Sequence, residues 1–167
     1  KKVKDPITGE EYLAPPPEEE KKIREVFNAL FALYFVEDKD DAALLKYDFE
    51  AAKNRFAQYT TKELAEWVAA MDALSIRPFG VENPIRCSDQ NHCTATRAAL
   101  EFRGLIIYDK TVCAKRGRDT PCVLRVGRDG ATSKNPQGVA LIAYLERKEG
   151  GKWVITRWDV YGLPLSQ

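Results

Sequence analysis

The chain has 167 residues, of which 44% are apolar and 31% charged, and its formal net charge is +1. These values are typical of one globular domain with a single hydrophobic core. No apolar run approaches the roughly 20 residues that span a bilayer, so a transmembrane segment within this chain is excluded.

The first seventeen residues differ in composition from the rest. They contain Asp5-Pro6, Gly9 and three prolines at 15–17, which disfavour a helix and favour an extended, polyproline-like arm. We therefore divide the chain into a Pro-rich arm at residues 1–17, which is a linker or a docking strap across a partner subunit, and one domain at residues 18–167. Because the sequence starts without methionine, we expect that a targeting peptide, a membrane anchor or an upstream domain has been removed.

Three helices are predicted between residues 18 and 72. The first begins near Pro17, with three glutamates in its first turn and an apolar stripe at three- and four-residue steps. The second follows the acidic run at residues 37–41, and the third follows a capping box formed by Thr60 and Glu63. The stripes, which we expect to form the core, contain Ile23, Val26, Phe27, Leu30, Phe31, Leu33, Tyr34, Leu45, Phe49, Ala52, Phe56, Leu64, Trp67, Val68 and Met71.

Nearly all strand-like sequence lies after Cys93. Prolines and polar residues predict a loop over residues 75–93, and strands are predicted at 94–108, 122–127, 139–147 and 152–161. A Glu-Gly-Gly turn joins the last two strands into a hairpin. Helices first and strands afterwards predict an α+β fold, in which three helices pack on a curved antiparallel sheet of about four strands to give a cone-like domain.

All four cysteines lie within 36 residues of one another, between the helical half and the sheet. They are Cys87, Cys93, Cys113 and Cys122. An even number of clustered cysteines predicts two structural disulfides in an oxidising compartment, with three pairings open. The alternatives are a zinc site with His92 in reserve, although the chain has no Cys-x-x-Cys knuckle, and reduced, inert cysteines.

The last predicted strand carries candidate binding residues. An uninterrupted alternation puts Trp153, Arg157, Asp159 and Tyr161 on one face, together with Ile155, and leaves Val154, Thr156, Trp158 and Val160 for the core. We predict that Trp153, Arg157, Asp159 and Tyr161 line a half-open cavity or a partner surface. The alternative is cross-strand support on the outer face of the sheet.

The two halves of the chain carry opposite charge. Residues 1–75 have 11 basic and 16 acidic side chains, whereas residues 76–167 have 15 and 9. The densest basic stretch, at residues 110–128, is either a contact for an acidic partner or a phosphate backbone, or a solvated hairpin. Aromatic residues are not interleaved with these charges, so nucleic acid is not an expected partner.

No stretch carries a clear catalytic signature. The single histidine, His92, lies on a predicted loop next to Cys93, and Asp48 and Asp159 are the remaining acid candidates. The sequence has no Gly-rich phosphate loop, paired metal carboxylates or nucleophile elbow. We therefore assign no catalytic residue, metal or cofactor, and we interpret the chain as noncatalytic, with an enzyme as the alternative.

Helices followed by a curved antiparallel sheet that closes on a Trp-containing strand are similar to the cone-shaped nuclear transport factor two-like superfamily. Within it, the Asn135-Pro136-Gln137-Gly138 segment resembles the Asn-Pro-x-Gly entrance to a late strand in periplasmic domains of type IV secretion assembly proteins. The resemblance implies a domain outside the cytoplasm that self-associates and contacts other secretion subunits. In those proteins the motif leads into the final strand, whereas here a further strand follows.

These observations together predict a protein-interaction or assembly domain of a larger membrane-associated complex. We expect it in the periplasm or an organelle lumen, with protein subunits of that complex as partners and a capacity for self-association. Two alternatives stay open. One is a small-molecule-binding, lyase-like or isomerase-like cone whose pocket is lined by Arg157, Asp159 and Tyr161, and the other is a zinc-stapled module associated with nucleic acid.

Overall fold

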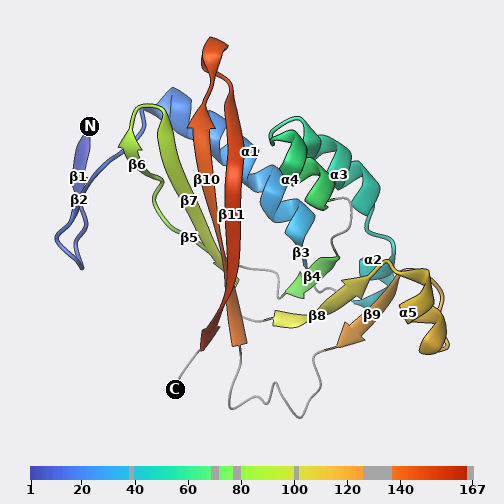
Figure 1. Ribbon diagram of the computed structural model, residues 1–167. Helices are drawn as coiled ribbons and strands as arrows, with labels where there is room; N and C mark the ends of the chain where they lie inside the picture. Colours follow the sequence, from blue (N-terminus) through green and yellow to red (C-terminus); the bar gives the residue numbers. More distant parts are fainter. Residues whose placement is uncertain (38–39, 69–71, 77–79, 100–101, 126–136, 165–167) are drawn as a thin grey trace.

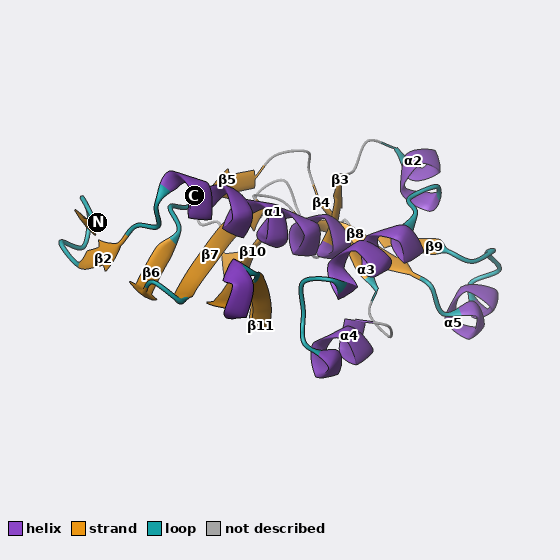
Figure 2. Ribbon diagram, turned by 90° about the horizontal axis from the view of Figure 1, so that it is seen from above, coloured by secondary structure: helices purple, strands orange, loops and turns teal. Residues whose placement is uncertain are grey.

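The computed structural model describes residues 1–37, 40–68, 72–76, 80–99, 102–125 and 137–164. Within these ranges five α-helices and two β-sheets are present, so the predicted α+β class is confirmed. Figures 1 and 2 show the larger sheet beside the N-terminal hairpin, with the smaller sheet and most of the short helices at the opposite end.

The larger sheet runs in the order β1-β2-β6-β7-β10-β11, and β5 also pairs with β7. Its strands are β1 (Lys2–Lys4), β2 (Glu11–Leu13), β5 (Gly80–Glu82), β6 (Arg86–Asp89), β7 (His92–Ala99), β10 (Gln137–Arg147) and β11 (Trp153–Pro164). All of these pairings are antiparallel. The predicted hairpin of the last two strands is confirmed, with the short 3-10 helix Glu149–Gly151 at its turn and Gly150 at φ 79°.

The smaller sheet has the order β3-β4-β8-β9. It contains β3 (Phe35–Glu37), β4 (Ala73–Ile76), β8 (Phe102–Ile107) and β9 (Cys122–Arg125), and β3 pairs in parallel with β4. The single strand predicted at residues 94–108 is therefore wrong, because β7 and β8 belong to different sheets. The predicted loop at 75–93 is also wrong, because it contains β5, β6 and the end of β4.

In the described part of the chain, four helices instead of the three predicted lie between β2 and β4. They are α1 (Pro17–Tyr34), α2 (Asp41–Leu45), α3 (Phe49–Ala57) and α4 (Lys62–Val68). The predicted second helix is split because the Asp40 carboxylate accepts from Ala43 N (2.7 Å) and the Asp48 carboxylate caps a new helix start. At α4 the capping hydroxyl belongs to Thr61, since Thr60 pairs instead with β11.

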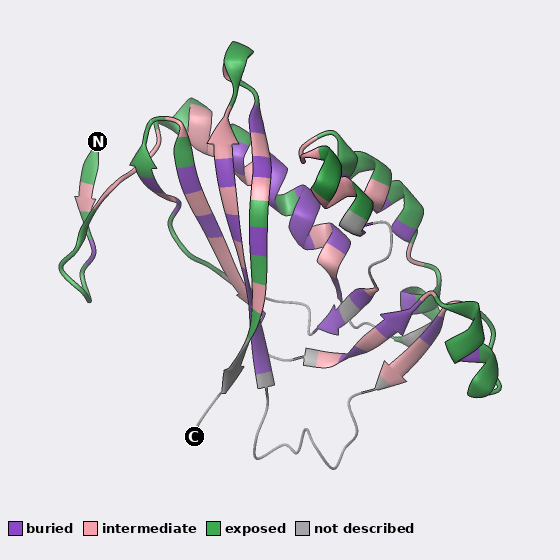
Figure 3. Cartoon of the chain, in the orientation of Figure 1, coloured by how far each residue is buried: buried purple, intermediate pink, exposed green. Residues whose placement is uncertain are grey.

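The main core lies between α1 and the face of the larger sheet that it covers. The residues of the α1 stripe are buried, except that Tyr34 is half-buried, and Phe56 of α3 meets Trp158 of β11 edge-on at 5.6 Å between ring centroids. Leu45, predicted to be core, is 41% exposed, and the Met71 prediction lies outside the described residues. Figure 3 shows the alternation of buried and more accessible residues along β10 and β11.

Residues 2–13 of the N-terminal arm form a β-hairpin instead of the predicted polyproline-like extension, whereas Pro16, just before α1, has polyproline-like angles of φ −57° and ψ 152°. β1 pairs with β2, and β2 joins the larger sheet at β6 through Leu13 opposite Cys87. Asp5 holds the hairpin turn, because its carboxylate accepts from Ile7 N (2.8 Å) and Thr8 N (3.0 Å) and forms an ion pair with Arg86. This ion pair fastens the hairpin to the sheet.

The two predicted disulfides are present. Cys87–Cys93 joins residues that lie opposite each other on β6 and β7, and Cys113–Cys122 joins helix α5 (Lys110–Lys115) to β9. All four cysteines are thereby oxidised, which is the chemistry expected in an oxidising compartment. Among the described helices, none has the length and apolarity needed to cross a membrane.

Candidate functional site

The larger sheet has an open face, on the side away from α1. In the register of β6, β7, β10 and β11, the residues Arg86, Thr94, Tyr144 and Arg157 lie opposite one another in a cross-strand row. A second row contains Thr96, Ile142 and Asp159. No described helix lies over these rows (Figure 2), and the residues in them are half-buried or exposed.

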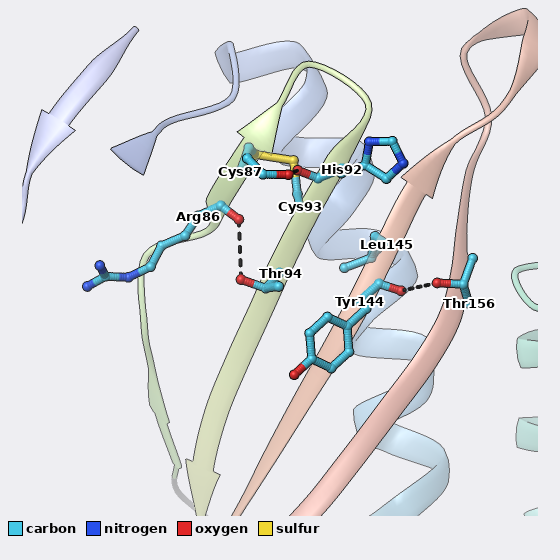
Figure 4. A pocket seen from close by; sticks show the side chains of 9 residues that line it. Arg86, Cys87, His92, Cys93, Thr94, Tyr144, Leu145 and Thr156 are labelled. Carbon is cyan, nitrogen blue, oxygen red and sulfur yellow. Dashed lines mark hydrogen bonds between the residues drawn. A yellow bond between two sulfur atoms is a disulfide. The ribbon is translucent and has the colours of Figure 1, made fainter. Parts of the chain in front are cut away.

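A shallow groove of about 350 Å³ lies on this face and is lined by residues of β6, β7, β10 and β11. Its lining is mainly apolar and includes Tyr144, Leu145 and the Cys87–Cys93 disulfide. Two lining hydroxyls are already hydrogen-bonded, because Thr94 Oγ1 donates to Arg86 O (3.2 Å) and Thr156 Oγ1 donates to Tyr144 O (3.3 Å). Figure 4 shows the Tyr144 ring lying along the groove while the Arg86 guanidinium extends away from it. The groove therefore offers an aromatic face and satisfied hydroxyl groups rather than a reactive centre.

Both arginines at the ends of the first row are stacked on tyrosines. The Arg157 guanidinium carbon is 3.9 Å from the centroid of Tyr144, and the Arg86 carbon is 4.4 Å from that of Tyr12. Such stacking restrains the long side chains and presents flat, amphipathic surfaces. The hydrogen bond from Arg86 holds the pKa of the Asp5 carboxyl well below its usual range, which keeps that pair ionised.

A β-bulge separates the predicted binding residues into two faces. The register between β10 and β11 shifts between Tyr144 and Leu145, which leaves Thr156 as an extra residue. Trp153 is consequently on the core face and only 2% exposed, so its placement beside the other candidates is wrong. Arg157, Asp159 and Tyr161 do share the open face, and Asp159 and Tyr161 are both exposed there.

Trp153 instead belongs to a buried polar contact between α1 and the hairpin. Its Nε1 donates to the Glu19 carboxylate at 2.6 Å, and Arg147 Nη2 lies 3.3 Å from the other oxygen of the same carboxylate. Glu19 thus ties the first turn of α1 to β10 and β11. The position of Trp153 is explained by this structural contact.

His92 is exposed at the start of β7 and contacts Asp89. Its Nδ1 is 2.9 Å from Asp89 Oδ1, and this hydrogen bond lowers the pKa of the Asp89 carboxyl. Ser88 supplies a third residue type found in hydrolase triads, but its hydroxyl donates to the His92 carbonyl oxygen (3.5 Å) and not to the ring. These three residues therefore lack the geometry of a nucleophile activated by a base.

The remaining acid candidate also has a structural role. The Asp48 carboxylate accepts from Ala51 N (2.9 Å) and begins α3, so it is a helix cap rather than a pocket acid. The covered side of the larger sheet is filled by side chains of α1, α3 and the sheet itself, including Phe27, Phe56 and Trp158. Within the described ranges, no group of histidine, cysteine and carboxylate side chains is arranged to hold a metal ion.

Sequence reasoning missed Arg86, Thr94 and Tyr144 as members of the open face. The available signal was the two-residue alternation within β7 and β10. The buried residues Cys93, Ala95, Leu141, Ala143 and Leu145 face the core, so the residues between them, Thr94, Thr96, Ile142 and Tyr144, face the other way. Arg86 could not be found in this way, because its segment was predicted to be a loop.

Comparison with family models, with curated proteins and with solved structures gives no match for this chain.

Proposed function

We propose that this chain is a noncatalytic protein-interaction domain, an assembly subunit of a larger membrane-associated complex outside the cytoplasm, and that the open sheet face contacts the partner subunit. The proposal is carried by one observation. The open face of β7, β10 and β11 presents Thr96, Ile142 and Tyr144 with no described helix over it, while the opposite face is closed by a packed core.

The composition of this face suits protein recognition. Partly buried aliphatic and aromatic side chains lie at its centre, and Arg157, Asp159 and Glu146 lie around them. Interfaces commonly combine an apolar centre containing tyrosine with a polar rim that contains arginine. The stacked Arg157 and Tyr144 side chains lose little conformational freedom on binding because they are already ordered.

Two further features favour this function over the small-molecule alternative. The covered side of the larger sheet, which would be the inside of the predicted cone, is filled by Phe27, Phe56 and Trp158. Arg157, Asp159 and Tyr161, the residues predicted to line a pocket, lie on the open face instead, where the hydroxyls of the groove are already hydrogen-bonded. Two disulfides agree with an oxidising compartment, and with no free thiolate among these cysteines the zinc-stapled alternative loses its ligands. The resemblance to secretion assembly domains supplies the kind of complex, a membrane-bound machine, as part of the proposal.

Charge insertion on the open face tests the proposal. Affinity capture from native membranes is compared for the wild type, for Ile142→Glu, and for Lys62→Glu on the exposed surface of α4 as a matched control. We expect Ile142→Glu to lose the captured subunits while its thermal unfolding midpoint stays near that of the wild type. Equal capture by all three proteins would contradict the assignment of this face.

A further inference from the structure

Residues 109–120, which comprise α5 and the turn after it, project from the smaller sheet as a knob (Figures 1 and 3). We call this segment the basic knob. Every one of its side chains is exposed except that of Cys113, which is fully buried. The basic knob is far from the open face described above, so it is a separate surface.

The backbone of the basic knob is fixed by contacts that use none of its cations. The Asp109 carboxylate accepts from Val112 N (3.1 Å), and the helix ends with Gly117 at φ 67°, where Gly117 N donates to Ala114 O and Arg118 N donates to Cys113 O. The disulfide from Cys113 then joins the knob to β9. Its cations are therefore displayed on a rigid support and are not needed to build it.

Four cations lie on the knob, namely Lys110, Lys115, Arg116 and Arg118. None forms an ion pair with a described carboxylate, whereas Arg24, Arg86 and Arg147 elsewhere in the chain all do. The knob contains only two acidic residues, Asp109 and Asp119, and the first is used as a helix cap. Unpaired like charges on a projecting element produce a positive potential that attracts an anionic surface.

An apolar residue lies among these cations. Val112 is 37% exposed, and Lys115 and Arg116 follow it at three and four residues, so the three side chains share one helix face. A projecting tip with an exposed apolar residue between cations matches a flat, diffusely charged surface better than it matches a shaped protein pocket. We propose that the basic knob docks on the anionic headgroups of a membrane, with Val112 entering the headgroup region.

The expected affinity of the basic knob for an anionic membrane is modest. Each Lys or Arg close to an anionic bilayer strengthens binding by about fivefold, so removing three of them weakens binding by roughly 100-fold. Because a Debye length falls from more than 10 Å to a few ångströms between about 50 mM and about 500 mM salt, most of the binding is lost over that range. The knob would thus orient the domain on a membrane without anchoring it.

Vesicle co-sedimentation tests the proposal on the full chain. Vesicles of phosphatidylcholine alone are compared with vesicles that also contain phosphatidylglycerol, for the wild type, for Lys115→Gln/Arg116→Gln/Arg118→Gln, and for the matched control Lys21→Gln/Arg55→Gln/Lys62→Gln. Both triple variants replace exposed cations, so both should keep the wild-type unfolding midpoint. Val112→Ser is a fourth protein, expected to bind roughly fivefold more weakly at every salt concentration because it loses its apolar contact.

The proposal predicts binding to anionic vesicles only, a loss of roughly 100-fold in the knob variant, and a much smaller change in the control. It is overturned if the wild type ignores anionic vesicles, if it binds both vesicle types equally, or if the two triple variants weaken binding equally. Wild-type binding to polyglutamate but not to vesicles, lost in the knob variant, would also overturn it and assign the knob to an acidic protein. None of these results depends on the open sheet face.

Discussion

Replacement of Glu19 by alanine is predicted to destabilise the fold through two side chains at once. The Glu19 side chain is 16% exposed, accepts from the buried Trp153 indole at 2.6 Å and pairs with Arg147 at 3.3 Å. In Glu19→Ala the indole N–H keeps no acceptor within the core, and the Arg147 guanidinium, whose Nε already lacks a hydrogen-bond partner, loses its carboxylate.

The magnitude follows from these two contacts. A buried donor that loses an ionised acceptor costs about 1.5–3 kcal/mol. The Arg147 side chain is 37% exposed, so solvent screening limits the ion pair to at most about 1 kcal/mol. Glu19→Ala should therefore lower the free energy of unfolding by about 2–4 kcal/mol. Because Glu19→Gln keeps a carbonyl oxygen for the indole, it should lose roughly 1 kcal/mol.

Urea unfolding followed by circular dichroism measures these differences, provided that the dependence on denaturant is unchanged between variants. Glu18→Ala is the matched control, since Glu18 is exposed in the same first turn of α1 and shares the helix-dipole interaction, worth about 0.3–1 kcal/mol. Equal destabilisation by Glu18→Ala and Glu19→Ala would refute the reasoning, because it would show that the contacts with Trp153 and Arg147 contribute nothing.

Three further predictions concern the disulfide of α5, a buried hydroxyl and the N-terminal hairpin. Cys113→Ala/Cys122→Ala should lower the free energy of unfolding by about 3 kcal/mol, because the bond closes a loop of sequence separation 9; an unchanged urea midpoint would contradict this. Ser75→Ala should leave stability unchanged or raise it by up to about 1 kcal/mol, because Ser75 Oγ is buried without a partner; a clear loss of stability would show a hydrogen bond there. The Asp5 pKa is depressed by Arg86, so its contribution is fully present above the ordinary pKa of about 3.9 and is lost as pH falls toward the lower folded value. The hydrogen-exchange protection factors of residues 1–13, corrected for the intrinsic exchange rate at each pH, should therefore fall on acidification below about pH 4 in the wild type and show no such step in Asp5→Asn; identical profiles would exclude this ion pair as the fastening.

Helices and strands in which apolar residues recur at regular spacing were predictable from the sequence. The α1 stripe has apolar residues at helical steps from Ile23 to Leu33, and a helix buries them together on one face. The β10 and β11 hairpin was predictable for a similar reason, since two alternating segments flank a Gly-Gly turn. The disulfides followed from the even number and clustering of the cysteines, although their pairing needed the register of β6 with β7 and of α5 with β9.

Other features depend on contacts that a local pattern does not contain. The bulge at Thr156 reverses the facing of every residue before it, which is why Trp153 lies in the core and not beside Arg157. The N-terminal hairpin is fastened to the sheet by the contact between Asp5 and Arg86, which lie 81 residues apart in the sequence. Helix α5 has too few residues for a helical pattern of apolar positions to be recognised in the sequence. It is stabilised by Asp109 at its N-terminus, by Gly117 after its C-terminus and by the disulfide of Cys113.

Site-specific photo-crosslinking on the open face is the most direct test of the central claim. A photoreactive amino acid at Ile142, at the centre of that face, is compared with one at Lys62 on α4, in cells that contain the native membranes. We predict a discrete adduct at Ile142 whose mass is the sum of this chain and one partner, or two copies of this chain, and no such adduct at Lys62. Absence of an adduct at Ile142 in a folded protein, or the same adduct at both positions, would contradict the assignment of this face to assembly.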